Sequence, residues 1–385
     1  MKLSILMPCL NEAETLEICI KKANQWISRS RFDCEVVIAD NGSTDGSQAI
    51  AIANGARVVS VSQKGYGSAL YHGIKASKGE FVIMGDSDDS YDFSQLDSFF
   101  NALEEGCDLV MGNRFLGGIN KGAMPWKNRY IGNPILTWIG RILFHCKAKD
   151  FHCGLRGFSK SAFEKMDLRT TGMEFASEMV IKASLFGMNV AEVPTILSRD
   201  GRSRPPHLRP WRDGWRHLRF MLLFSPKWLF FFPGLLILVI SSFAYIPLAL
   251  GSVQIYSVVF DIHTLFYAQA AMIIGYLTIA FGMIIRLFGM REGLLQNNVW
   301  LRSLNSYPLL EMGGMIGICL TALGIFIGSY ALNSWRLLEF GNLNDHTVLR
   351  IVSISTTFII FGAITILISL IMGFLALPTR KDRFD

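Results

Sequence analysis

The stretch FVIMGDSDDSYDF, residues Phe81 to Phe93, joins a short apolar run to a cluster of acidic side chains. The run Phe81–Met84 is typical of a buried strand, and a glycine follows it. Four carboxylates then fall within seven residues: Asp86, Asp88, Asp89 and Asp92. Carboxylates at the end of a buried strand need a partner of opposite charge, so the stretch predicts a bound cation.

Strand-like and helix-like segments alternate around this stretch, up to about Pro226. Apolar strand-like runs cover Leu3–Pro8, Glu35–Asp40, Ala56–Val61, Glu80–Asp86 and Cys107–Gly112. Helical periodicity is found between them, in Glu12–Trp26, Asp45–Asn54, Gly67–Ser77 and Phe93–Glu105. This order predicts an α/β domain whose mostly parallel sheet is flanked by helices. Ligands of such sheets bind beyond the carboxyl ends of the strands.

Polar residues follow four of the five predicted strands. They are Asn11 and Glu12 after the first, DNGSTDGS from Asp40 after the second, DSDDS after the fourth, and Arg114 after the fifth. DNGSTDGS alone is equally typical of a turn with a capped helix. The D-x-D carboxylates suit Mg²⁺ or Mn²⁺, which bind carboxylate and phosphate oxygens. We therefore expect a divalent cation that holds a nucleotide diphosphate. DSDDS also fits a phosphatase motif, which would leave DNGSTDGS without a role.

The remainder of the chain is much more apolar. Hydrophobic residues make up 51% of the 385, and the mean hydropathy is +0.34. Four runs are long enough to cross a bilayer, at Trp228–Leu250, Leu265–Leu287, Met312–Leu332 and Ile351–Leu377. Buried core helices would explain them less well, because core helices are rarely so long and so free of charge. We predict a transmembrane domain of four helices over residues 227–385.

Lys and Arg placement predicts the orientation. The segment before the first span is strongly basic, and the loop between the first two spans contains neither Lys nor Arg. The N-terminal domain is therefore expected in the cytoplasm, although Arg336 and Arg350 near the third loop weaken the pattern slightly. The net charge of +6 points to anionic lipid and phosphate. We expect no nucleic-acid partner.

Several motifs, taken together, resemble family 2 glycosyltransferases with the GT-A fold. MPCLNEAE, VIADNGSTDGS, KGYGSALYHGI, GDSDD and GNRF occur in the family's order. KNRYIGN, KDFHCGLRGF, GMEFASEM and AEVPTILSRDGRSR resemble the polyprenyl-phosphate sugar synthases, that is, dolichyl- or undecaprenyl-phosphate mannosyl- and glucosyltransferases. The resemblance covers about Leu3 to Arg219, and some members also carry membrane anchors.

The resemblance implies roles for individual residues. Those on the donor nucleotide are Pro8, Asn11, Glu12, Asp40, Lys64, Gly65 and Asp86. Those at the Mg²⁺ or Mn²⁺ are Asp86 and Asp88, with Ser90 in the place of the family's usual glutamine, so that Asp89 or water is an alternative third ligand. Those on the acceptor phosphate are Arg114, Arg129, Asn133, Arg199, Ser203 and Arg204. Asp86, Asp88, Arg114 and Arg129 would be catalytic, and Asp150, Arg156, Glu174 and Glu178 would support them.

A lipid acceptor requires a site near the membrane. The segment His207–Phe224 interleaves Trp with Arg, as expected of a helix that lies in the headgroup region. We predict a GT-A domain over 1–205, this interfacial helix or linker over 206–226, and the transmembrane domain. The apolar and basic segment Lys127–Phe144 is a second candidate for membrane contact.

The predicted function is inverting, metal-dependent transfer of a hexose from UDP-glucose or GDP-mannose to a polyprenyl phosphate. The product would serve cell-envelope glycosylation, and the bacterial inner membrane is the expected location. Relatives suggest a homo-oligomer. The alternatives are transfer to a glycolipid hydroxyl or a polysaccharide, and a catalytically silent membrane scaffold. A processive polysaccharide synthase is disfavoured because the chain has no Q-x-x-R-W string.

Overall fold

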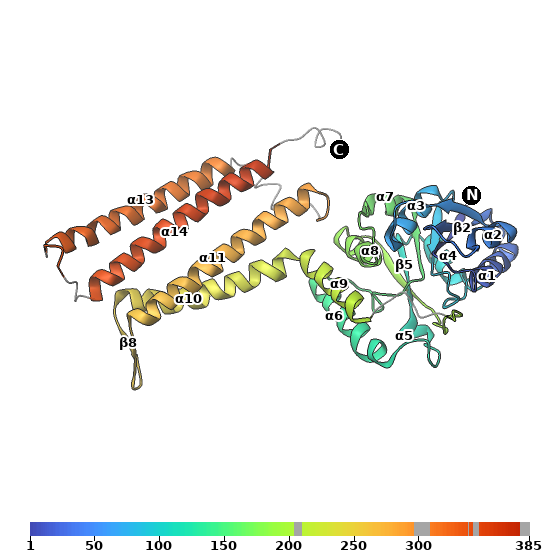
Figure 1. The fold of residues 1–385 in the computed structure, drawn as a ribbon, viewed down its shortest axis with the longest axis horizontal. Coiled ribbons are helices and arrows are strands. Elements are labelled where there is room, and N and C mark those ends of the chain that lie inside the picture. The colour runs from blue at the N-terminus through green and yellow to red at the C-terminus, as the bar shows by residue number, and fades with distance from the viewer. Residues whose placement is uncertain (204–209, 296–308, 338, 342–345, 378–385) are drawn as a thin grey trace. The chain divides into compact units, whose positions relative to one another are not determined.

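The computed structural model describes residues 1–203, 210–295, 309–337, 339–341 and 346–377. The chain divides into two compact units, Met1–Leu222 and Leu223–Asp385. Figure 1 shows strands and helices mixed in the first unit and long helices in the second. Each unit is described by itself below.

The first unit is built on a seven-stranded sheet in the order β3-β2-β1-β4-β6-β5-β7. Its strands are β1 Leu3–Cys9, β2 Cys34–Asp40, β3 Arg57–Ser60, β4 Phe81–Met84, β5 Leu109–Asn113, β6 Arg156–Ser159 and β7 Val190–Pro194. Only β6 runs antiparallel to its neighbours, β4 and β5. Every residue of the central strand β1 is buried, which explains its continuous apolar sequence.

Ten helical segments accompany this sheet. They are α1 Leu16–Arg29, α2 Ser47–Ala53, α3 Tyr66–Ala76, α4 Asp97–Glu104, α5 Arg114–Gly117, the π-helical turn η1 Asn128–Gly132, α6 Asn133–Phe144, α7 Lys160–Met166, α8 Glu174–Leu185 and α9 Pro210–Leu223. Helix α1 turns Leu16, Cys19, Ile20, Ala23 and Trp26 inward, at the spacing of one helical face. These residues share one core cluster with strands β1 and β4.

The mixed, mostly parallel sheet with flanking helices confirms the predicted fold class. All five predicted strands and all four predicted helices are present, with ends shifted by a few residues. Strands β6 and β7 were not predicted. RGFS, the sequence of β6, is short and contains Arg and Gly, so its own pattern does not indicate a strand. Strand β6 pairs with β4 on one side and β5 on the other, so it separates two strands that are consecutive in the sequence.

Among its described residues, the second unit contains four long apolar helices, as predicted. They are α10 Phe232–Leu250, preceded by the π-helical turn η2 Lys227–Phe231, and α11 Ile262–Arg291, α13 Leu309–Arg336 and α14 His346–Leu375. All four are long and apolar enough to cross a membrane. A short hairpin, β8 Val253–Ile255 and β9 Val258–Phe260, joins α10 to α11.

Glycines allow the helices of this unit to approach closely. On α13, a Cβ at Gly317 would lie 2.6 Å from Ile366 Cγ1 and 2.8 Å from the Gly362 oxygen of α14. Helices α10 and α11 meet in the same way at Gly234 and Gly275. Small residues are the usual means by which membrane helices pack backbone against backbone.

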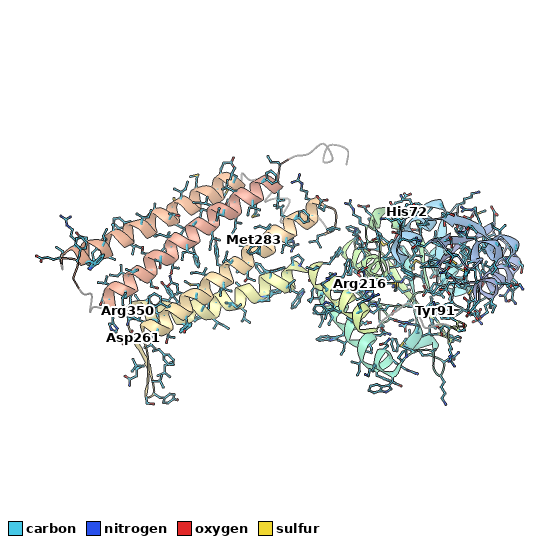
Figure 2. The ribbon with its side chains drawn as sticks, viewed as in Figure 1. His72, Tyr91, Arg216, Asp261, Met283 and Arg350 are labelled. Carbon is cyan, nitrogen blue, oxygen red and sulfur yellow. The ribbon has the colours of Figure 1, made fainter. Side chains whose placement is uncertain are left out.

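A buried arginine of α14 forms an ion pair with the residue that precedes α11. Arg350 is buried and donates to a carboxylate oxygen of Asp261, and both residues are labelled in Figure 2. Arg350 also donates to the backbone oxygen of Leu248, at the end of α10. Arg350, one of the two arginines that weaken the charge pattern between the last two spans, is therefore paired within this unit.

Candidate functional site

The strand ends that the sequence singled out meet at one edge of the sheet. Cys9 of β1 pairs with Asp40 of β2, and Leu6 of β1 pairs with Met84 of β4, with all three strands parallel. Strand β5 runs the same way, because it is antiparallel to β6, which is antiparallel to β4. The polar segments after β1, β2, β4 and β5 therefore start at the same edge.

The loops after β1 and β2 are tied to each other. Asn11 N–H donates to Ser43 Oγ at 2.9 Å, and the Asn11 side-chain oxygen accepts from Thr44 N–H at 2.8 Å. Ala13 N–H donates to an Asp45 carboxylate oxygen at 2.9 Å. Asn11 has a φ of 59°, in the left-handed region that asparagine tolerates better than most residues. These bonds give the two loops a fixed shape.

Asp40 is almost fully buried, and its contacts organise its own loop. Its carboxylate accepts from Gly42 N–H and Ser43 N–H, and from Gln48 Nε2 at 2.6 Å. This matches the capped-turn reading of DNGSTDGS. Lys64 and Gly65 approach the same loop, since Lys64 Nζ donates to the Asn41 backbone oxygen and Gly65 N–H donates to Asn41 Oδ1. Asp40, Lys64 and Gly65, three of the predicted nucleotide residues, thus lie around one loop, which Asp40 organises.

The carboxylates of the opening stretch point in different directions. Asp89 forms an ion pair with Lys22 of α1 at 2.7 Å, and Asp92 accepts from Ser94. Asp86 accepts from the Tyr66 hydroxyl at 2.9 Å. Burial and the nearby charge of Asp88 raise the pKa of Asp86 to about 6. Crowded, buried negative charge at Asp86 and Asp88 is what a divalent cation would relieve.

Ser90 and Asp89 fit the role of third metal ligand poorly. The Ser90 hydroxyl donates to Asp88 Oδ1 at 2.5 Å, so it orients that carboxylate. Asp89 is drawn to Lys22 in α1. Glu12 is better placed as a neighbour, because one guanidinium bridges Glu12 and Asp88.

That guanidinium belongs to Arg202, a residue without a role in the sequence analysis. Its Nη1 lies 3.0 Å from Glu12 Oε1 and its Nη2 lies 2.5 Å from Asp88 Oδ2. The segment that carries it runs beside the acidic stretch, with Gly201 N–H bonded to the Asp88 backbone oxygen and Ser198 N–H to that of Ser90. The sequence signal for this residue is the arginine-rich segment SRDGRSR. A loop has no periodicity, so the sequence alone does not show that Arg202 turns inward.

A pocket of about 450 Å³ opens next to Arg202. It is lined by Asn11, Glu12, Ala13, Glu14, Thr44, Asp45 and Arg202. Ser203, predicted to bind phosphate, donates its N–H and its hydroxyl to the Glu14 carboxylate. Arg199 is exposed, and Arg204 lies outside the described residues.

Arg114 is held by a buried partner. Its Nε and Nη2 each lie 2.7 Å from one carboxylate oxygen of Asp150, and its backbone N–H donates to the same carboxylate. A bidentate pair of this kind fixes the plane of the guanidinium. Arg114 is therefore positioned by Asp150, and a phosphate would meet a guanidinium with two N–H groups already in use.

The other predicted acceptor residues lie on a more exposed element. Arg129 is in η1, where its guanidinium lies over the Tyr130 ring, 5.4 Å from the centroid. Asn133 begins α6 and lies near the Met124 sulfur. The apolar residues that are exposed in η1 and α6, or just before them, are Trp126, Tyr130, Ile131, Ile135 and Trp138. Lys127 and Arg141 lie beside them in the sequence and are exposed too.

All four supporting residues hold elements together, and the contacts of Glu174 are described with α9 below. Arg156 is fully buried and donates to the backbone oxygens of Cys153, Phe151 and Ala176. Glu178, also fully buried, pairs with Lys182 and accepts from Arg169 N–H and Thr170 N–H. Asp150, described above, fixes Arg114.

Helix α9 is tied to α8 by two polar contacts. Glu174 of α8 pairs with Arg216 at 3.0 Å, and Ser177 of α8 is hydrogen-bonded to His217 Nδ1 at 2.8 Å (Figure 2 labels Arg216). The ring centroids of His217 and His152 lie 4.9 Å apart, and His152 lies in the loop that precedes β6. Trp215, next in sequence, is exposed. One side of α9 therefore packs on the domain.

The loop before β6 approaches the acidic edge. Gly154 N–H donates to the Tyr91 hydroxyl at 3.0 Å, and a Cβ at Gly154 would lie 2.6 Å from Asp86 Oδ2. The absence of a side chain at this position leaves room for that carboxylate oxygen. Tyr91, labelled in Figure 2, is buried.

Comparison with known proteins agrees with this fold. The family described as "Glycosyl transferase family 2" matches residues 4–167. A dolichyl-phosphate hexose transferase of Haloferax volcanii is 31% identical over 195 residues, which are 50% of this chain and 81% of that protein. The chain belongs to glycosyltransferase family 2. It has the form with membrane helices, since "Glycosyltransferase family 2 C-terminal transmembrane region" matches residues 283–376.

Two further similarities are more partial. The low-salt glycan biosynthesis hexosyltransferase Agl6 of Haloferax volcanii is 39% identical over 264 residues, which are 68% of this chain. The match spans 63% of that relative's length. The glucosyl-3-phosphoglycerate synthase of Mycobacterium tuberculosis, solved with Mn²⁺ and uridine diphosphate, is 23% identical with a TM-score of 0.44, over 58% of this chain and 77% of that one. A likeness this distant transfers no ligand, so the metal must be argued from this chain's own residues.

Proposed function

We propose that this protein transfers a hexose, with inversion, from a nucleotide sugar to a polyprenyl phosphate and needs Mg²⁺ or Mn²⁺ to do so. UDP-glucose and GDP-mannose are the expected donors. The observation that carries the proposal is the carboxylate pair Glu12 and Asp88, in the loops after β1 and β4, which one guanidinium bridges, with Asp86 close enough for the charge of Asp88 to raise its pKa. Its support from relatives is the similarity to a dolichyl-phosphate hexose transferase.

The residues at this edge fit a hard divalent cation. Asp86 and Asp88 offer carboxylate oxygens, the ligands such ions prefer. The raised pKa of Asp86 and the arginine beside Asp88 both indicate a site with surplus negative charge. When bound there, the ion would neutralise charge that develops on a diphosphate leaving group. Ser90 would then orient Asp88 and leave the third ligand to another group.

The pocket beside Glu12 and Thr44 is the proposed site of the nucleotide. It adjoins the acidic edge, so a nucleotide there would have its diphosphate next to Asp88. The loop bonds between Asn11, Ser43 and Thr44 fix its wall before any ligand arrives. Such a preformed wall lowers the entropy cost of binding.

An acceptor phosphate is the proposed partner of Arg114 and Arg129. A phosphate monoester has a second pKa of about 6 and is mostly dianionic at neutral pH. It can attack the anomeric carbon without giving up a proton, whereas a hydroxyl acceptor would require a base. Arg114 and Arg129 would orient the acceptor and balance its charge. Asp150 keeps the Arg114 guanidinium in one plane for this purpose.

The exposed surface of η1 and α6 supports a lipid acceptor. Trp126 and Trp138 are 65% and 63% exposed. Indole rings and cations together suit the headgroup region of a bilayer. Trp215 of α9 is also exposed, in line with the interfacial role predicted for that helix. The cytoplasmic orientation, the bacterial inner membrane, the boundaries 1–205 and 206–226, and a homo-oligomer remain predictions.

The proposal is tested with the full chain in detergent, Mn²⁺ or Mg²⁺, undecaprenyl phosphate or dolichyl phosphate, and radiolabelled UDP- and GDP-sugars. We expect label from one donor to enter the organic phase, and a chelator to abolish the transfer. Transfer only to a glycolipid hydroxyl would replace the acceptor in this proposal. Failure of every donor, with no nucleotide bound by calorimetry, would favour a catalytically silent protein.

A further inference from the structure

The side chain of Arg202 lies inside the acidic group that the proposed function assigns to a divalent cation. Its guanidinium bridges Glu12 and Asp88, and its Nε lies 3.5 Å from Asp200. The side chain is 11% exposed, so these contacts are largely shielded from water. Shielding makes a charge pair harder to replace than one at an open surface.

Two cations in contact with Asp88 Oδ2 would repel each other at short distance. Asp88 Oδ1 is already bonded to Ser90 N–H and to the Ser90 hydroxyl, so Oδ2 is the oxygen most open to a cation, and it is the one that Arg202 contacts. The backbone bonds of Ser198 and Gly201 to the acidic stretch keep Arg202 beside it. A metal ion at Asp88 therefore competes with the guanidinium for this oxygen.

We infer that Arg202 is an internal counter-ion of the metal site, which the divalent cation must displace and which makes metal binding depend on the nucleotide. This inference rests on the proposed function. When the metal binds alone, it gains Asp88 as a ligand, but Arg202 loses its ion pair with Asp88. Metal that arrives with a nucleoside diphosphate brings new negative charge, with which the released guanidinium pairs. Arg202 thus acts as a positioning residue that favours joint binding of metal and donor.

The test measures Mn²⁺ affinity by electron paramagnetic resonance of free Mn²⁺, on the full chain in detergent with neither acceptor nor sugar. Arg202→Gln is expected to bind Mn²⁺ about tenfold more tightly than the wild type, because a competing charge at contact distance has gone. UDP or GDP should strengthen Mn²⁺ binding in the wild type and do so less in the variant, as expected for coupled sites. Affinity equal to or below that of the wild type would overturn the inference.

Arg31→Gln is the matched control. It removes the same charge at an exposed side chain between α1 and β2, outside the predicted site, and should leave Mn²⁺ affinity close to the wild-type value. An equal gain in both variants would show a general charge effect and would also overturn the inference. If Arg202→Gln does not fold, Arg202→Lys takes its place, with an intermediate gain expected because one ammonium cannot bridge both carboxylates as the fork does. Lipid transfer is not part of this assay, so failure of the proposed acceptor would leave its outcome unaffected.

Discussion

The two N–H groups that Arg114 directs at Asp150 both lie 2.7 Å from their carboxylate oxygens, and Asp150 is fully buried. The pair joins the end of β5 to the loop that precedes β6. It fixes a proposed acceptor residue by means of a carboxylate that no substrate reaches.

Asp150→Asn should therefore destabilise the first unit strongly. The variant leaves a buried guanidinium without a counter-charge, a change that costs about 3–5 kcal/mol in comparable pairs. Thermal unfolding of the full chain in detergent measures the effect. Asp167→Asn is the control, since its pair with Arg169 is exposed and should contribute about 1 kcal/mol or less. Equal shifts in the two variants would contradict a special role for the buried pair.

Asp88→Asn should abolish transfer and weaken Mn²⁺ binding, while membrane insertion stays normal. The amide keeps the shape of the side chain but loses the charge that a divalent cation needs. Transfer to lipid and free Mn²⁺ are measured side by side. Asp92→Asn, in the same stretch but bonded to Ser94, should retain both. Undiminished turnover in Asp88→Asn would remove this carboxylate from the metal site.

His152 should make stability depend on pH. Burial, with help from His217 and Arg114, lowers the pKa of His152 well below its usual value, so the folded protein keeps the ring neutral. The unfolded chain takes up a proton below about pH 6.5, and stability should fall by up to about 1.4 kcal/mol per pH unit below that. Melting temperatures measured between pH 7.5 and 5 test this dependence. His152→Asn should make the melting temperature change less with pH. Substitution of the exposed His72 should leave the slope intact.

Gly317→Leu should loosen the pair α13–α14. Its side chain would meet Ile366 and the backbone of Gly362, and overpacking of this kind costs about 1–3 kcal/mol. Gly314→Leu, three residues earlier in the same helix, meets nothing within 4 Å and should be tolerated. Melting in detergent, followed by size-exclusion chromatography, compares the two. A larger loss in Gly314→Leu would contradict the close approach of α13 and α14 at Gly317.

Trp138→Ser should raise the KM for polyprenyl phosphate and leave the KM for the nucleotide sugar nearly unchanged. The proposed reason is loss of an indole that holds the acceptor side of the domain at the headgroups. Ile52→Ser, which removes an equally exposed apolar side chain from α2, is the comparison. If both variants change the KM for lipid alike, the surface of η1 and α6 has no special contact with it.

The sequence predicted the strands that bear an apolar run and a polar end, because burial and the parallel arrangement impose both features locally. It also predicted the four apolar helices, whose length follows from the thickness of a bilayer. Strand β6 was missed because its place depends on pairing with β4 and β5 rather than on its own four residues. Arg202 was missed for a related reason. That Arg202 turns toward Asp88 depends on the backbone bonds of Ser198 and Gly201, which the sequence does not reveal.

Strand β6 also bears on how relatives of this protein can be recombined. It is hydrogen-bonded to β4 on one side and to β5 on the other. Strands β1 to β4 carry the proposed nucleotide site, and β5 leads to the proposed acceptor residue Arg114. Strand β6, which comes after all of these in the sequence, joins the two parts into one sheet. A chimera cut after α4 would bring a foreign β6 against β4. Donor preference should therefore transplant only when residues 150–159 travel with the first hundred.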